Sequence, residues 1–146
     1  MREILFRAKK INSDKWVEGS YVYFYDVENP NHYQHRIYLR RSESERDGND
    51  YHFYPDYEIV DKKSICQFTG LTDINGTKIY EKDILGISNK APVLILYDND
   101  CCCFMATYKD NIMVPLSIYR DWPVIGNAFD NQELLKSFLN KIKKEF

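Results

Sequence analysis

Short runs of alternating apolar and polar residues, separated by polar turn sequences, dominate this chain. In the first run, Ile4, Phe6 and Ala8 fall on one side of an extended segment. Short polar side chains at residues 12–15 favour a turn, and a β-branched and aromatic run follows at residues 16–25. This pattern predicts an opening β-hairpin.

Further strand-like runs follow along the rest of the chain. Residues 26–35 and 41–50 are predicted to be loops because they are polar, and the second range has no apolar residue. The sequences at residues 73–76 and 98–100 are typical of tight turns. Strands are expected at residues 36–40, 51–54, 59–60, 64–68, 78–80, 83–87, 91–97, 101–108, 112–116 and 124–125.

Only the end of the chain has the apolar spacing of an α-helix. Asp130 is suited to cap its start, and Glu133 follows three residues later, as in a capping box. Lysines crowd the last turns, where the helix dipole favours cations, and we interpret this end as a solvated surface. One apolar face is formed by Leu134, Leu135, Phe138, Leu139 and Ile142.

Many short strands and one helix predict a mainly β fold of the α+β class. The tight turns favour a small β-barrel or a strongly bent antiparallel sheet with one C-terminal α-helix. The composition is that of a globular protein, because 44% of the 146 residues are apolar and 29% are charged. We expect residues 1–146 to form a single domain, either undivided or with a small N-terminal β subdomain (about 1–60) beside a barrel-like part (about 61–146).

Charge and hydropathy limit the kinds of partner and the cellular location that we expect for this protein. The net charge of −2 argues against a strongly basic nucleic-acid coat protein, although a local basic patch is compatible with it. Arg2, Glu3 and Arg7 interrupt the opening, so a signal-peptide core is not expected. The longest apolar run, residues 91–97, is far shorter than the about 20 residues that cross a bilayer. We expect a soluble protein of the cytoplasm, with no membrane partner.

The four cysteines are Cys66 and the contiguous residues 101–103. A disulfide framework spreads its cysteines, and zinc sites leave at least two residues between paired ligands, so neither pattern fits. We interpret the cysteines as small strand residues and expect no metal or cofactor. A thiol or metal enzyme is a lesser alternative, because a catalytic thiol would need the fold to bring it to one of the distant histidines, which are His32, His35 and His52.

Carboxylates gather in sequence at Asp73, Glu81 and Asp83. Paired carboxylates can bind a metal or share acid–base work. However, Asp73 opens the turn that contains Asn75, where Asp is favoured for its bonds to the backbone, and the ligand spacing of an EF-hand is missing. We therefore favour turn formation and exposed charge.

Tyrosines give the most suggestive diffuse pattern. Tyr21, Tyr23 and Tyr25 alternate and so share one face of the predicted strand. With Arg36 and residues 40–41 nearby in sequence, such rings could stack on single-stranded nucleic acid. Tyrosine is equally favoured in protein interfaces, and half-buried rings are also common on ordinary β-sheets.

Two single residues are candidates for ligand contacts. Arg7 has the planar guanidinium that binds a phosphate or carboxylate through two bonds, although we favour an ion pair that anchors the first strand. Asn127 could contact a ligand, although we favour a role in starting the last helix.

Three segments together resemble one protein family. Residues 65–85, ICQFTGLTDINGTKIYEKDIL, are similar to the YopX family pattern Q-[YF]-T-G-L-x-D-x-N-G-x-x-I-[YF]-E-G-D-[IV]. Residues 3–8, EILFRA, resemble the family's EIKFRA opening, and residues 124–135, VIGNAFDNQELL, resemble its V-I-G-N-I-[YF]-x-N-P-E-L-L closing. The resemblance covers essentially the whole chain. It implies a phage or prophage protein of unknown function, and it supplies no catalytic residues.

Two positions depart from the family pattern. Lys82 stands where the family usually has Gly, and a positive φ there would strain the turn. Gln132 replaces the usual Pro of the first helical turn, which is a mild change because Pro is optional there.

The expected function is that of a non-enzymatic accessory protein that binds another protein or a second copy of itself. A small-barrel nucleic-acid binder is the alternative. The common phosphate-binding and hydrolase motifs are missing, which counts against the usual enzyme classes. The candidate binding residues are Arg7, Tyr21, Tyr23, Tyr25, Asp73, Asn75, Tyr80, Glu81, Asp83 and Asn127.

Overall fold

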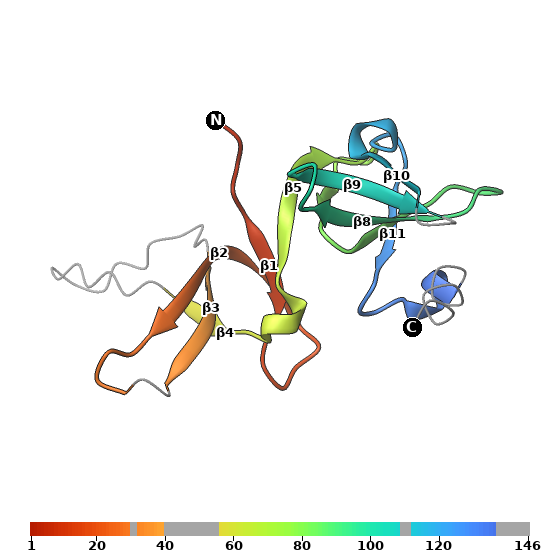
Figure 1. Ribbon diagram of the computed structural model, residues 1–146. Coiled ribbons are helices and arrows are strands. Elements are labelled where there is room, and N and C mark those ends of the chain that lie inside the picture. The colour runs from red at the N-terminus through yellow and green to blue at the C-terminus, as the bar shows by residue number, and fades with distance from the viewer. Residues whose placement is uncertain (30–31, 40–55, 109–111, 137–146) are drawn as a thin grey trace, which may run out of the picture. The chain divides into compact units, whose positions relative to one another are not determined.

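The computed structural model describes residues 1–29, 32–39, 56–108 and 112–136 (Figure 1). The chain forms two compact units. We call Glu3–Gln67 the N-terminal unit, and Met1–Arg2 together with Phe68–Phe146 the C-terminal unit. The strands pair in two antiparallel sheets, which confirms the mainly β class.

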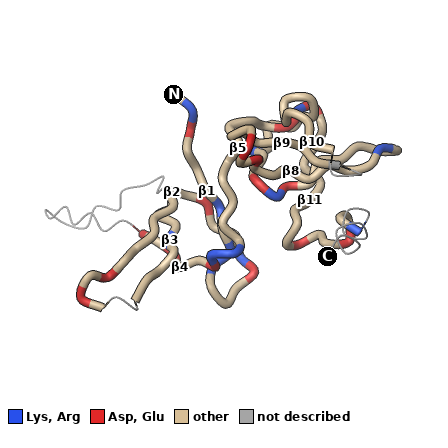
Figure 2. Tube along the Cα trace, in the orientation of Figure 1, with Lys and Arg blue, Asp and Glu red and all other residues tan. Residues whose placement is uncertain are grey.

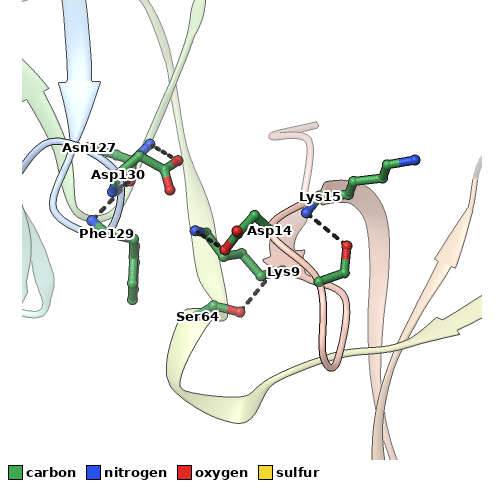
Figure 3. Close-up of polar contacts among 8 residues, drawn as sticks. Lys9, Asp14, Lys15, Ser64, Asn127, Phe129 and Asp130 are labelled. Atoms are coloured by element: carbon green, nitrogen blue, oxygen red, sulfur yellow. Dashed lines mark hydrogen bonds and ion pairs between the residues drawn. The ribbon is translucent and has the colours of Figure 1, made fainter.

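In the N-terminal unit, the strands pair in the order β4-β3-β2-β1-β5. The predicted opening hairpin is confirmed, because β1 pairs with β2 from Phe6 opposite Gly19 to Lys9 opposite Trp16. A short 3-10 helix, η1 (Lys62–Ser64), is tied to β1 because the Lys9 N–H donates to the Ser64 hydroxyl at 2.7 Å (Figure 3). The strands are β1 (Phe6–Lys9), β2 (Trp16–Tyr25), β3 (Tyr33–Leu39), β4 (Tyr57–Ile59) and β5 (Cys66–Thr72).

Strand alternation gives this unit its core. Ala8, Ile37 and Val60 are buried, and Phe6, Val17, Tyr21, Leu39 and Ile65 pack against them. Gly19 lies where β2 passes closest to β3, because an added Cβ would fall 2.0 Å from the carbonyl oxygen of Tyr38. Only glycine fits this position.

The C-terminal unit contains a five-stranded sheet in the order β10-β9-β8-β7-β11, and β5 pairs with β6. Its core consists of Ile79, Leu85, Val93, Ile95, Ala106 and Leu116. The strands are β6 (Lys78–Tyr80), β7 (Asp83–Leu85), β8 (Val93–Asp98), β9 (Cys103–Tyr108), β10 (Ile112–Pro115) and β11 (Val124–Asn127), and η3 (Leu116–Ile118) is a 3-10 turn.

The predicted small β-barrel is wrong for the described residues. The strands β10 and β11 are the two edges of the five-stranded sheet and do not pair with each other. Each has only four residues, and the pairing of β11 with β7 is broken by a register shift between Val124 and Gly126. Closure needs edge strands that pair along their length, and such short, interrupted edges do not provide it.

The predicted C-terminal α-helix is not found in the described residues. The chain instead forms a short 3-10 helix, η4 (Gln132–Leu135), whose cap is Asn131 and not Asp130. Asp130 accepts a bond from the side chain of Asn127, which draws its carboxylate into the preceding turn. Leu135 is buried as the pattern requires. Residues 137–146, which include Phe138, Leu139 and Ile142, lie outside the described residues.

Some predicted boundaries also shift. The loop predicted at residues 26–35 is shorter, since β3 already begins at Tyr33, opposite Tyr25. The strand predicted at residues 101–108 begins at Cys103. The loop at residues 41–50 and the strand at residues 51–54 lie outside the described residues. No helix in the described part of the chain has the length and apolar character needed to cross a bilayer.

Candidate binding surface

The carboxylate of Asp73 is used inside the protein. Its Oδ1 accepts the backbone N–H groups of Asn75 and Thr77, and its Oδ2 accepts that of Val124, each at 2.8 Å. Burial alone would raise the pKa of Asp73, but these donors outweigh it and hold the pKa below the usual value. Asp73 therefore shapes the turn and fastens it to β11, while Asn75 is exposed at the turn itself.

Asp83 and Tyr80 are likewise interior residues, so the expectation of exposed charge is wrong for Asp73 and Asp83. The Oδ2 atom of Asp83 accepts the Tyr80 N–H at 2.8 Å, and Asp83 is only 1% exposed. The Tyr80 ring is buried with its centroid 5.6 Å from that of Phe68. Glu81 is half-buried. Among the described residues, no group of three or more His, Cys, Asp and Glu side chains is placed to hold a metal ion.

Lys82, between these residues, has the positive φ that would strain a residue other than glycine. Its φ is +64°. Its N–H donates to the Ile95 carbonyl at 2.7 Å, and its own carbonyl accepts the Ala128 N–H at 2.9 Å. The ammonium lies 5.3 Å from the centroid of the Phe129 ring. These backbone bonds hold Lys82 in the left-handed conformation.

Asn127 organises the turn before η4 (Figure 3). Its Oδ1 accepts the N–H groups of Phe129 at 2.9 Å and Asp130 at 3.0 Å, and its Nδ2 donates to the Asp130 carboxylate at 3.0 Å. The N–H of Asn127 donates to the side chain of Asn131 at 3.1 Å. The amide of Asn127 thus acts within its own turn.

The contiguous cysteines lie at the turn between β8 and β9, so the prediction that they form strand is wrong for Cys101 and Cys102. The Asp98 carboxylate accepts the N–H groups of Asp100 and Cys101 at 2.8 and 2.9 Å, and Cys102 has a φ of +53°. These bonds extend the turn as far as Cys103, where β9 begins. The negative charge of Asp98, with a smaller contribution from burial, raises the pKa of the Cys101 thiol and disfavours the nucleophilic thiolate.

A shallow pocket of about 350 Å³ lies beside this turn in the C-terminal unit. Arg2, Tyr97, Cys102 and Cys103 are among its lining residues, and no described histidine is. Cys66 belongs to the N-terminal unit, where it is buried and donates its Sγ–H to the Ser64 carbonyl at 3.3 Å. The described geometry offers this pocket no imidazole base for a thiol.

Arg7 lies on β1 against an aromatic ring. Its guanidinium carbon is 4.8 Å from the centroid of the Trp16 ring, and the Lys9 ammonium is 5.5 Å from the same ring. These distances are those of cation–π contacts. Arg7 is half-buried in this position.

The predicted row of tyrosines forms one continuous surface with β3. In the antiparallel register, Tyr23 lies opposite His35 and Tyr25 lies opposite Tyr33, so these side chains share a face. Tyr23, Tyr25 and Tyr33 are 52%, 50% and 58% exposed. The Tyr23 ring centroid is 5.2 Å from that of His35 and 6.1 Å from that of Tyr33. We call Tyr21, Tyr23, Tyr25, Tyr33 and His35 the tyrosine face.

Tyr21 and His35 anchor the tyrosine face. The Tyr21 hydroxyl lies 2.7 Å from His35 Nδ1, and the two rings are stacked 9° from parallel. Burial, assisted by the charge of Lys62, lowers the pKa of His35, which favours the neutral imidazole, and its Nδ1 can then accept a hydrogen bond from the Tyr21 hydroxyl. Burial also raises the pKa of Tyr21, with a smaller contribution from Tyr23, which keeps the phenol protonated.

Arg36 lies on the opposite face of the hairpin, which corrects its predicted place beside the tyrosines. It is opposite Val22 in the register, whereas the tyrosine face uses the odd-numbered residues. Its guanidinium carbon is 3.8 Å from the Phe24 ring centroid and 4.1 Å from that of Tyr57. Period-two alternation indicates which residues of one strand share a face, but predicting this cluster also requires the register of β3. Residues 40–41 lie outside the described residues.

One comparison with known proteins shows the family, and a second shows a similar fold. The family model described as YopX protein matches residues 5–136. The crystal structure of protein EF1440 from Enterococcus faecalis is similar with a TM-score of 0.55 and 24% sequence identity, and the match covers 93% of this chain and 100% of that chain. At this identity the likeness shows the fold alone. No curated protein matches the chain. Because the family match extends over most of its length, the chain belongs to the YopX family.

Proposed function

We propose that this YopX-family protein is a non-enzymatic accessory protein of a phage or prophage that binds other proteins through the tyrosine face. The observation that carries the proposal is the group of three half-exposed tyrosines around His35 on the hairpin of β2 and β3. Tyrosine is enriched in protein interfaces because one rigid side chain offers a large apolar ring and a polar end.

The rings are held in place before any partner arrives. Tyr23 contacts both His35 and Tyr33, and Tyr21 is fixed by its hydroxyl and by the Phe6 ring, whose centroid is 5.5 Å away. Ordering side chains on binding costs conformational entropy, so rings that are already packed lose less of it. This surface is therefore suited to a specific contact.

The charge around the tyrosine face favours a protein over a nucleic acid. Figure 2 shows acidic positions at the end of β2, where Asp26 and Glu28 follow the strand. Arg36 is turned to the opposite face. A surface that binds single-stranded nucleic acid normally lines its stacking rings with cations that neutralise phosphates.

The opposite face supports a second candidate function, the binding of single-stranded nucleic acid. It carries Arg36 between Phe24 and Tyr57, and Arg7 and Lys9 around Trp16. However, Arg36 already donates from Nε and a terminal nitrogen to the Gln34 side chain, at 2.9 and 2.7 Å. The test is the anisotropy of a labelled thymidine oligonucleotide. This candidate requires binding that weakens steeply with salt and that the Arg36→Ala variant loses.

The favoured function is tested by capture from a lysate of infected host cells, with and without nuclease. The baits are the wild-type protein, a Tyr23→Ser/Tyr33→Ser variant and a matched Tyr97→Ser control, because Tyr97 is 41% exposed but lies in the C-terminal unit. We expect a nuclease-resistant partner that wild type and control retain and the double variant loses. Equal retention by all three baits, or a partner released by nuclease, would overturn the proposal.

A further inference from the structure

The strand β2 has an open edge over more than half of its length. It has ten residues, but β1 pairs only with Trp16–Gly19. The remaining residues, Ser20–Tyr25, pair with β3 on one side. On their other side, none of the strands in ranges 1–29, 32–39, 56–108 and 112–136 pairs with them.

The hydrogen bonds of β3 show which backbone groups point to this edge. The His35 carbonyl accepts the Val60 N–H, and the Leu39 N–H donates to the Asp56 carbonyl, both at 2.9 Å. The odd-numbered residues of β3 therefore direct their backbone groups toward β4. Because backbone groups alternate between the two sides of a strand, its even-numbered residues direct theirs toward β2.

The same alternation fixes the direction of the backbone groups in β2. Its even-numbered residues lie opposite even-numbered residues of β3, as Val22 does opposite Arg36, and so bond to that strand. The Asp26 N–H, which donates to the His32 carbonyl at 3.2 Å, continues this ladder. The odd-numbered residues point the other way. The N–H and C=O groups directed at the open edge are those of Tyr21, Tyr23 and Tyr25.

This edge lacks the features that keep strands from pairing with other chains. Such edges are normally protected by lysine, proline, a bulge or short length. Residues 20–25, SYVYFY, contain no charge, proline or glycine, and their register with β3 is unbroken. In Figure 2 the tube along this part of β2 has neither acidic nor basic positions. The segment has the high β propensity and low charge of sequences that add to another strand.

We propose that β2 pairs in antiparallel fashion with β2 of a second copy of this chain, about a two-fold axis through Tyr23. The inference rests on the proposed binding function of the hairpin and names its partner. In this register Tyr23 faces Tyr23 of the partner subunit, Tyr21 faces Tyr25 of the partner subunit, and Val22 faces Phe24 of the partner subunit. The two sheets then continue into one.

The register follows from the backbone groups. Three outward-facing residues in each copy offer three N–H and three C=O groups, and an axis through Tyr23 pairs all of them in six interchain bonds. An axis through Val22 would set Tyr25 opposite Gly19 of the partner subunit, and Gly19 is already paired with Phe6 in its own chain. Only the Tyr23 axis leaves no edge group of the tyrosines unpaired.

The sequence of the edge argues for a second copy over an unrelated strand. A two-fold interface brings the same surface of both subunits together, so it must be complementary to itself. Residues 21–25, YVYFY, alternate tyrosine with an apolar residue and keep that pattern when reversed. Because these residues are uncharged, like strands meet without repulsion.

The test is the mass of the full chain in solution over a range of concentrations, by light scattering and sedimentation. We expect wild type to form a dimer and Tyr23→Phe, which keeps the N–H and the ring, to do the same. Tyr23→Pro should be a monomer, because it removes the central N–H at the open edge while leaving the bonds to β3. A wild-type monomer, or a folded Tyr23→Pro dimer, would overturn the inference.

A cysteine variant tests the register and covers the case in which Tyr23→Pro does not fold. With the exposed residues 101–103 changed to serine, Tyr23→Cys should form an interchain disulfide with itself on mild oxidation, whereas Tyr21→Cys should do so only when mixed with Tyr25→Cys. Self-linking of Tyr21→Cys alone, or no link at Tyr23→Cys, would reject the register. If the wild-type protein is a monomer but captures a partner that the Tyr23→Ser/Tyr33→Ser variant does not, this inference is rejected and the proposed function stands.

Discussion

The carboxylate of Asp73 accepts the backbone N–H of Val124 at 2.8 Å, across 51 residues of sequence. The same carboxylate also accepts two N–H groups of its own turn. Asp73 therefore joins a local turn to the first residue of β11. Both carboxylate oxygens are occupied, which makes this position sensitive to a change as small as one atom.

The first prediction is that Asp73→Asn destabilises the protein. An amide offers a single acceptor oxygen, and its NH₂ group would face an N–H donor that is left unsatisfied in a buried place. We expect a loss of about 2–3 kcal/mol in the free energy of unfolding, measured by urea denaturation. Asp98→Asn is the matched control, because only Oδ1 of Asp98 accepts the two turn N–H groups. Its loss should be at most about 1 kcal/mol, and equal losses would contradict this explanation.

The second prediction concerns acid stability. The folded protein holds the pKa of Asp73 below its unfolded value, because three backbone donors outweigh the effect of burial. Between the folded and the unfolded pKa of Asp73, the unfolded state binds more protons than the folded state, so the free energy of unfolding rises with pH. The contribution of Asp73 is thus complete above its unfolded pKa of about 4 and is lost as pH falls through the folded value.

The measurement is the free energy of unfolding from about pH 2 to pH 6. Asp73→Asn should show a shallower decline toward acid than wild type, since it removes one depressed carboxyl. Parallel acid limbs for wild type and Asp73→Asn would show that Asp73 does not contribute.

The turn at Asp73 and the conformation of Lys82 could be predicted because both depend on short-range structure. An Asp followed by Asn-Gly forms a turn through its own backbone, and a position where glycine is usual indicates a positive φ. The shared face of Tyr21, Tyr23 and Tyr25 was predictable for the same reason, since it follows from a period of two.

The features that were missed depend on pairing between distant segments. Sequence proximity suggests that Arg36 lies beside the tyrosines, but it does not reveal the register of β3, and a shift of one residue exchanges the faces. The contribution of His35 and Tyr33 to the tyrosine face depends on the same register. The barrel was wrong because closure depends on whether β10 and β11 meet, which no local pattern states.

The third prediction is that Lys82→Gly stabilises the protein. Lys82 has a φ of +64°, which is strained for a residue with a Cβ and unstrained for glycine. The gain is reduced by the greater freedom of glycine in the unfolded chain and by the lost contact with Phe129. We expect a net increase of about 0.5–1 kcal/mol in the free energy of unfolding. Lys82→Ala, which keeps the Cβ, should not stabilise, and a gain for alanine as large as for glycine would contradict the backbone explanation.

The fourth prediction addresses the thiol-enzyme alternative through Cys101. Because the charge of Asp98 raises the pKa of this thiol, alkylation by iodoacetamide at neutral pH should be slower at Cys101 than at a free cysteine in solution. Asp98→Asn should lower the pKa of Cys101 and speed its alkylation, while Asp121→Asn, an exposed change elsewhere in the C-terminal unit, should have no effect. Rates at each cysteine are followed by peptide mass spectrometry as pH is varied. If Cys101 of the wild-type protein is alkylated at neutral pH as fast as a free cysteine or faster, this prediction is contradicted. The enzyme alternative is then strengthened, because a nucleophilic cysteine must be a thiolate at the pH at which it reacts.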